Sequence, residues 1–267
     1  MKKTNIFLAI PLSFGSKALY REVGKSWGGR VFGYLFVVQL IFWAFICIGI
    51  QSQFSMWVVQ DAPAVLSQIP EISITNGVVS TDVEEPHFIT NPENPDEVWF
   101  VIDTTGQYTE LTQDILGGLM TENKVYIRQQ SSLNEVRMYD LSTVPQFNMN
   151  ADTVKGWLDL ARTLLFWVLL PLCALGGFIW RLLLGLWYGL LGLIPNGFLA
   201  EKSDYGVIYR TAIVAMTPAM FLKLLKTLLH LNIQLFWLLS FAVGFGYLVF
   251  GLWAQSEEGR DKPEEFV

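Results

Sequence analysis

Charged residues are scarce in this sequence. They make up 16% of the chain, whereas a soluble domain carries about a quarter. The shortage is concentrated in uncharged runs, and a membrane-spanning helix needs roughly 20 mostly apolar residues. These runs cover residues 31–50, 163–180, 182–200, 211–222 and 231–254. Such a pattern excludes an ordinary soluble globular protein and predicts an α-helical polytopic membrane protein.

Cysteine and histidine are almost absent, which limits the chemistry open to the chain. Cys47 and Cys173 both lie inside apolar runs, where a free thiol behaves as a small hydrophobe. His87 and His230 each lack a second histidine or cysteine nearby. The sequence therefore predicts no disulfide, no metal site and no cofactor. Phosphate-binding loops, dinucleotide fingerprints and Ser-His-Asp spacings are missing too, so we expect no enzymatic activity.

Positive charge is scarce in one long segment. Residues 52–162 hold 16 Asp and Glu but only five Lys and Arg, a net charge of −11. Nucleic acid requires a basic surface, so we expect no nucleic-acid partner. The chain also lacks any Asn-x-Ser/Thr sequon, which disfavours a glycosylated eukaryotic exterior.

The start of the chain is basic and amphipathic. Six Lys and Arg precede the first apolar run, and basic residues near a span stay in the cytoplasm. We expect this start to lie uncleaved at the membrane interface, which places residues 52–160 outside. The predicted segments are a cytoplasmic amphipathic stretch 1–30, spans 31–51, 161–197, 209–230 and 233–254, an outer domain 52–160, a cytoplasmic loop 198–208, and an unstructured cytoplasmic tail 255–267.

The second apolar tract has two interpretations. Leu164 to Pro195 would make a helix of roughly 48 Å, longer than the hydrocarbon core of about 30 Å. We favour one long helix, kinked near Pro171 or Gly176-Gly177, with Arg181 near the cytoplasmic face. The alternative is a tight hairpin that turns at Arg181, which would add a fifth span and place the C-terminus outside.

The outer segment is predicted to fold as an inserted extracytoplasmic mixed α/β domain, mainly antiparallel. We expect the first helix to continue to Pro70. "EISITNGVVSTD" predicts two strands around Asn76-Gly77, the strongest short hairpin signal. "EVWFVIDTTG" predicts a central strand, and "KVYIRQ" and "EVRMYDL" predict two more around a turn at residues 131–134. "ADTVKGWLDLARTL" predicts a helix that continues into the second span.

Several stretches together resemble a known family. They are "SFGSKALYREVGKSWGGRVFGYLF" before the first span, "IPEISITNGVVS" and "VIDTTG" in the outer domain, and "YGVIYRTAIVAMTPAMFL" at the third span. Their order is similar to that of the bacterial membrane-protein family catalogued as domain of unknown function 1189. The third-span pattern also has a distant likeness to Yip-type membrane proteins. The resemblance implies a bacterial cytoplasmic-membrane protein of unassigned activity and supplies no catalytic residues to carry over, while the basic start of the chain predicts a multi-pass topology with the N-terminus inside.

Asp103 and Thr104 begin an Asp-Thr-Thr-Gly turn that is similar to the Asp-Thr-Gly turn of aspartic proteases. That chemistry needs a second carboxylate to share a proton, and the sequence has no second copy of the turn. We therefore interpret Asp103 as the cap of a turn that ends a strand. A ligand-facing rim at Asp103 and Thr104 is the alternative hypothesis.

The third span carries a basic face near its predicted outer end. Lys223, Lys226, His230 and Gln234 follow one another at helical spacing. We favour long side chains that extend to the outer headgroups, and a track for a substrate or a lipid phosphate is the alternative. Arg210, at the predicted cytoplasmic end of the span, is a further candidate lipid contact.

These features favour a non-enzymatic accessory or assembly subunit that acts through its outer domain. Its expected partners are membrane lipids and another membrane or envelope protein. The alternative is a small transporter or lipid-handling protein that uses the basic face of the third span. A sensor is a third hypothesis, which the short tail disfavours.

Overall fold

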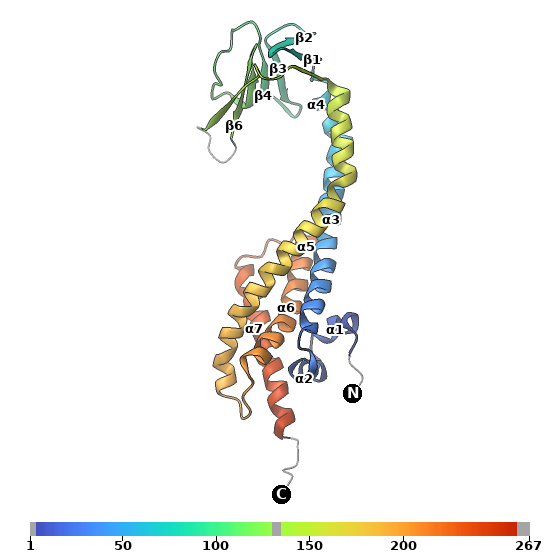
Figure 1. The fold of residues 1–267 in the computed structure, drawn as a ribbon, viewed down its shortest axis with the longest axis vertical. Helices are drawn as coiled ribbons and strands as arrows, with labels where there is room; N and C mark the ends of the chain where they lie inside the picture. Colours follow the sequence, from blue (N-terminus) through green and yellow to red (C-terminus); the bar gives the residue numbers. More distant parts are fainter. Residues whose placement is uncertain (1–3, 130–134, 261–267) are drawn as a thin grey trace. The chain divides into compact units, whose positions relative to one another are not determined.

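The computed structural model describes residues 4–129 and 135–260. The chain divides into two compact units. One contains the residues up to Gln51 together with those from Phe166 onward, and the other contains Ser52–Leu165. Both β-sheets belong to the second unit, and Figure 1 traces the elements along the chain. Helices that could span a membrane and a separate mixed-sheet unit are therefore both present.

Four helices within the described ranges are long and apolar enough to cross a membrane. They are α3 (Arg30–Gln60), α5 (Ala151–Gly197), α6 (Tyr205–Leu228) and α7 (Phe236–Arg260). Helix α5 continues without interruption through Arg181, so the structure has one 47-residue helix where a hairpin was the alternative.

Two helix ends differ from the prediction. The first helix was expected to reach Pro70, but α3 ends at Gln60 and a short helix α4 (Ala62–Leu66) follows. Pro63 lies in the first turn of α4, where proline is tolerated because that N–H has no helical partner. At the other end, α7 continues to Arg260, so the predicted unstructured tail begins as helix. Residues 261–267 lie outside the described part of the chain.

The amphipathic start forms two helices, α1 (Ile6–Leu12) and α2 (Lys17–Ser26). Helix α1 exposes 65% of Phe7 and 56% of Leu8, as expected for a segment at the membrane interface. Helix α2 differs, because its apolar face packs against α6 and α7. Its buried residues are Leu19, Tyr20 and Val23. The apolar face of α2 therefore belongs to the bundle core.

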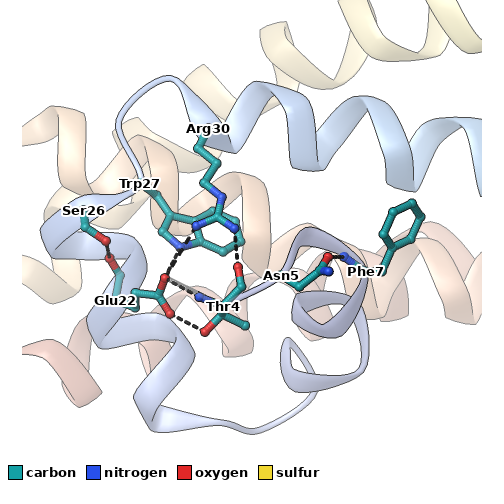
Figure 2. Close-up of polar contacts among 7 residues, drawn as sticks. All are labelled: Thr4, Asn5, Phe7, Glu22, Ser26, Trp27 and Arg30. Atoms are coloured by element: carbon teal, nitrogen blue, oxygen red, sulfur yellow. Dashed lines mark hydrogen bonds and ion pairs between the residues drawn. The ribbon is translucent and has the colours of Figure 1, made fainter. Parts of the chain in front are cut away.

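A carboxylate ties the start of the chain to α2 and α3 (Figure 2). Glu22 accepts hydrogen bonds from the Thr4 N–H (3.0 Å), from the Thr4 hydroxyl and from Trp27 Nε1 (3.1 Å). Arg30 donates to the Thr4 carbonyl and lies 3.8 Å from the Glu22 carboxylate. Burial raises the pKa of Glu22, but these hydrogen bonds and the Arg30 charge outweigh it and lower the pKa below its ordinary value.

The second unit contains two sheets (Figure 1). A three-stranded sheet has the order β2-β1-β8, and a five-stranded sheet has the order β3-β4-β5-β6-β7. All neighbours are antiparallel except β4 and β5. The strands are β1 (Ile72–Thr75), β2 (Val78–Thr81), β3 (His87–Asn91), β4 (Asn94–Ile102), β5 (Ile115–Met120), β6 (Lys124–Arg128), β7 (Val136–Asp140) and β8 (Gln146–Met149).

The predicted hairpin at Asn76-Gly77 is confirmed. Strands β1 and β2 pair antiparallel on either side of it, with φ of 51° at Asn76 and 82° at Gly77. Positive φ at both central residues is the requirement of a type I′ turn, which asparagine and glycine satisfy best. The expected strands at β4, β6 and β7 are present as well, and the predicted turn between β6 and β7 lies outside the described residues.

Central strand β4 supplies both cores of this unit because successive side chains point to opposite faces. Ile102 packs with Ile72, Ile74 and other residues of the three-stranded sheet. Its neighbour Val101 packs on the opposite face with Ile115 and other apolar residues. Alternate side chains of β4 therefore fill the two hydrophobic cores of this unit.

The Glu22 contacts predict an acid-sensitive start of the chain. A lowered pKa stabilises the fold above the unfolded value of about 4.3, and this contribution is lost as the pH falls through the lower folded value. Glu22→Gln should remove about 1–2 kcal/mol of local stability at neutral pH and abolish the acid dependence. Amide hydrogen exchange over residues 4–12, with variant and parent compared at each pH, measures both effects. Equal protection in the two proteins would contradict the assignment.

Candidate anion-binding site

A small cavity lies among α5, α6 and α7 in the first unit. Its volume is about 210 Å³, below the range of roughly 300–1,000 Å³ that is typical of sites for whole drug-sized ligands. Two cations, Arg181 of α5 and Lys223 of α6, line it. The remaining lining residues are Leu184, Tyr188, Ala219, Trp237, Ser240 and Phe241.

No carboxylate balances these two charges. The sequence has no Asp or Glu between Asp159 and Glu201, and none between Asp204 and Glu257. Within the ranges that the structure describes, neither cation forms a salt bridge. Charged side chains inside apolar helix bundles are costly and usually pair or contact a ligand. The cavity is therefore suited to an anion.

Polar groups from two helices complete the cavity wall. Ser240 Oγ of α7 is buried and has no hydrogen-bond partner among the described residues. The Tyr188 hydroxyl makes a single long contact, 3.5 Å to the Phe241 carbonyl. An unpartnered buried hydroxyl costs free energy unless something in the cavity bonds to it. Two cations and a free hydroxyl thus face one space.

Small residues on α5 bring the three helices together. A Cβ added at Gly185 would lie 3.1 Å from Tyr209, and one at Gly189 would lie 3.1 Å from the Tyr205 hydroxyl. At Gly192 it would lie 2.6 Å from Ile208 of α6. The G-x-x-x-G at Gly185 and Gly189 is therefore a packing face, which lets the helices approach closely. This face follows Arg181 by one turn of helix.

Two placements expected from the sequence exclude each other in this structure. Arg181 was expected near the cytoplasmic face and Lys223 near the outer end of its span, yet both line the same cavity. Lys223 is five residues from the end of α6 at Leu228, about 7 Å along the helix. Arg181 consequently lies at the level of the α6–α7 connection, so the two expected placements cannot both hold.

The predicted basic face of the third span is interrupted. Helix α6 ends at Leu228, and His230 adopts a positive φ of 50° in the connection to α7. Lys226 lies over the ring of Phe236, 4.6 Å from its centroid. Only Lys223 lines the cavity, so Lys226, His230 and Gln234 do not continue a helical track with it.

Arg210 lies far from this cavity. It is 13 residues before Lys223, about 20 Å along α6, and its Nη2 donates to the Gly24 carbonyl at 3.1 Å. Gly24 is in the last turn of α2, where unpaired carbonyls and the helix dipole favour a positive charge. The contact that the structure gives Arg210 therefore fastens α2 to α6.

Asp103 and Thr104 belong to the second unit, directly after β4. The Asp103 side chain is fully buried, and its Oδ1 accepts from the Thr105 N–H (2.9 Å) and hydroxyl (2.6 Å). Its other oxygen accepts from the Tyr108 N–H. The Thr104 N–H donates to Glu85. These contacts match the predicted turn cap.

Glu85 is a second carboxylate near Asp103, but the two do not form a protease-like pair. Burial raises the pKa of each group, and hydrogen bonds outweigh it, so both pKa values lie below their ordinary ranges. A dyad that shares one proton requires one strongly raised pKa. Both carboxylates are instead ionised at neutral pH and hold the turn in place. The described residues contain no group of three His, Cys, Asp or Glu that could bind a metal ion.

Most of the residues that line the cavity could not be identified from the sequence. Arg181 is the only charged residue between Arg162 and Glu201, and a lone charge inside an apolar run is itself a signal of function. Tyr188, Trp237 and Ser240 had no such signal, because tyrosine, tryptophan and serine are common in membrane helices. Only the folded bundle shows that they meet.

Asp103→Asn should destabilise the second unit by about 1–3 kcal/mol, because an amide NH₂ would face the Tyr108 N–H in a buried site. Asp140→Asn is the matched control, since Asp140 caps its own turn through the Ser142 N–H at 2.8 Å but is exposed. Thermal unfolding of the full chain in detergent measures both. Equal shifts for the two variants would contradict the buried-cap assignment.

Comparisons with known proteins give one match. No curated protein and no solved structure matches the chain. A family model described as "Protein of unknown function (DUF1189)" matches residues 7–252. The match includes both units and every stretch on which the resemblance was based, so the chain belongs to the DUF1189 family.

Proposed function

We propose that this protein is a non-enzymatic lipid-handling protein of the bacterial cytoplasmic membrane, which binds the phosphate group of an anionic lipid between α5, α6 and α7. One observation supports this most directly: Arg181 and Lys223 line one small cavity without any carboxylate beside them. Arginine and lysine are the usual phosphate ligands of proteins.

The proposed orientation in the membrane agrees with a lipid ligand. Five basic residues before α3 and Arg30 at its first position favour a cytoplasmic N-terminus. With four spans, the connection between α6 and α7 is then extracytoplasmic. Lys223 lies about one and a half turns before the end of α6, and Trp237 is the second residue of α7. Lys223 and Trp237 would therefore lie near the depth of the outer-leaflet phosphates. The acidic second unit would lie on the same side of the membrane.

The apolar surroundings favour a lipid over a free anion. Trp237 is 69% exposed and Leu183, two residues after Arg181, is 52% exposed. Apolar side chains exposed on helices of this kind face the acyl chains of the bilayer. A phosphate in the cavity could therefore remain attached to chains that lie along α5 and α7.

Removal of either cation should weaken lipid binding. Arg181→Gln and Lys223→Gln should each lower the affinity for phosphatidylglycerol about tenfold or more, because each removes a charge-assisted contact. Lys226→Gln is the matched control, since Lys226 lies over Phe236 and outside the cavity. Native mass spectrometry in an uncharged detergent counts the lipid that stays bound, with phosphatidylcholine as the zwitterionic comparison. Equal retention by all three variants, or equal retention of both lipids, would overturn the proposal.

A second candidate function uses the second unit as a docking domain for an envelope protein. The observation that favours it is the edge strand β7, where all five residues are exposed, because an open edge can accept a further strand. Met138→Pro would block main-chain pairing there, and Met138→Ala would leave the backbone unchanged. A stoichiometric partner that co-purifies with the alanine variant but not with the proline variant would support docking. Purification without a partner in both cases would reject it.

A further inference from the structure

The number of charges in the cavity limits which phosphate it can hold. This step rests on the proposed function and asks only about the chemical class of the headgroup. Arg181 and Lys223 supply two positive charges, and no acidic residue lies on the described parts of α5, α6 or α7 that line the cavity. A phosphodiester carries one negative charge and would leave one cation uncompensated. A phosphate monoester carries nearly two at neutral pH.

Side chains from three helices can donate hydrogen bonds to a phosphate in the cavity. Arg181 from α5, Lys223 from α6 and Ser240 from α7 each present a donor, and Ser240 Oγ has no partner among the described residues. A monoester has three terminal oxygens that accept strong hydrogen bonds, whereas a diester has two. Three helices can thus each contribute one donor to a monoester.

The size of the cavity limits how much of the ligand it can enclose. At about 210 Å³ it accommodates a phosphate and a few neighbouring atoms. A glycerol or sugar attached to the far side of a diester would have to fit beside the exposed Trp237 or displace it. A terminal phosphate has no such second substituent.

We propose that the cavity selects the terminal phosphate monoester of a lipid over the bridging phosphodiester of common phospholipids. Arg181 and Lys223 neutralise its two charges, and Ser240 donates to the third oxygen. The lipid chain leaves through the exposed apolar surface between α5 and α7.

The test compares phosphatidic acid, a monoester, with phosphatidylglycerol, a diester, for binding to the full chain in uncharged detergent. At about pH 7.5 we expect phosphatidic acid to bind about tenfold more tightly, equivalent to one charge-assisted hydrogen bond. The second ionisation of a phosphate monoester is near pH 6. The preference should therefore fall to about threefold at about pH 5.5, where only about a quarter of the monoester is doubly charged.

Phosphatidylglycerol serves as the control for the protein's own groups, because it does not ionise in this range. The charged or titratable groups that face the phosphate are Arg181 and Tyr188 from α5 and Lys223 from α6, and α7 contributes neither kind. Ser240→Ala should reduce the preference for phosphatidic acid while it leaves phosphatidylglycerol binding unchanged. Inorganic phosphate at equal concentration distinguishes a lipid from free phosphate as the ligand. If inorganic phosphate occupies the cavity and neither lipid does, the cavity is a site for free phosphate.

The outcomes separate this inference from the function on which it rests. Equal, Arg181-dependent binding of both lipids would overturn the monoester preference and leave the lipid-binding function intact. A monoester preference that persists in Arg181→Gln would place the preference elsewhere and overturn the assignment to this cavity. Binding of neither lipid would overturn both proposals.

Discussion

Uncompensated positive charge on apolar helices is the constraint on which the proposed function depends, with Arg181 half-buried and Lys223 exposed. Arg181 and Lys223 are surrounded by helices that contain no carboxylate over their apolar lengths. Ion pairs in a low-dielectric interior are at best marginally favourable, and a single unpaired charge there is strongly unfavourable. Elsewhere in the bundle, cations have partners: Arg30 lies beside Glu22, and Lys17 lies 2.9 Å from Glu257. Among the described residues, Arg210 and Lys226 lack a carboxylate too, but Arg210 donates to the Gly24 carbonyl and Lys226 lies over the Phe236 ring.

The rest of the bundle positions these charges. Glycines on α5 allow α6 and α7 to approach closely enough for Lys223 and Ser240 to reach the space in front of Arg181. Helix α2 packs against α6 and α7, where Arg210 and Gln255 donate to its backbone carbonyls. The N-terminal residues are fixed in turn by Glu22. Substitutions remote from the cavity can therefore change its geometry through helix packing.

Periodicity and turn chemistry were sufficient to predict the four long helices, the hairpin at Asn76-Gly77 and strand β4. Strands β3, β5 and β8 could not be foreseen. Strand β5 contains Gly117, which normally weakens a strand, yet a Cβ there would lie 2.4 Å from the Trp99 carbonyl. The glycine is needed for close approach to β4, which only the folded sheet reveals. The cavity was unpredictable for a similar reason: Arg181, Lys223 and Ser240 are separated by at least 17 residues in sequence, and their meeting depends on how α5 crosses its neighbours.

The most direct test of the account is a distance between a lipid phosphorus and the Arg181 guanidinium nitrogens. Solid-state NMR with ³¹P–¹⁵N recoupling on the full chain in bilayers that contain phosphatidic acid measures it, and Arg181→Lys identifies the signal. We predict that a bound ³¹P dephases the Arg181 nitrogens, as in a direct ion pair, and that Lys223→Gln weakens the effect. An ordered Arg181 signal that no ³¹P dephases would contradict the central claim.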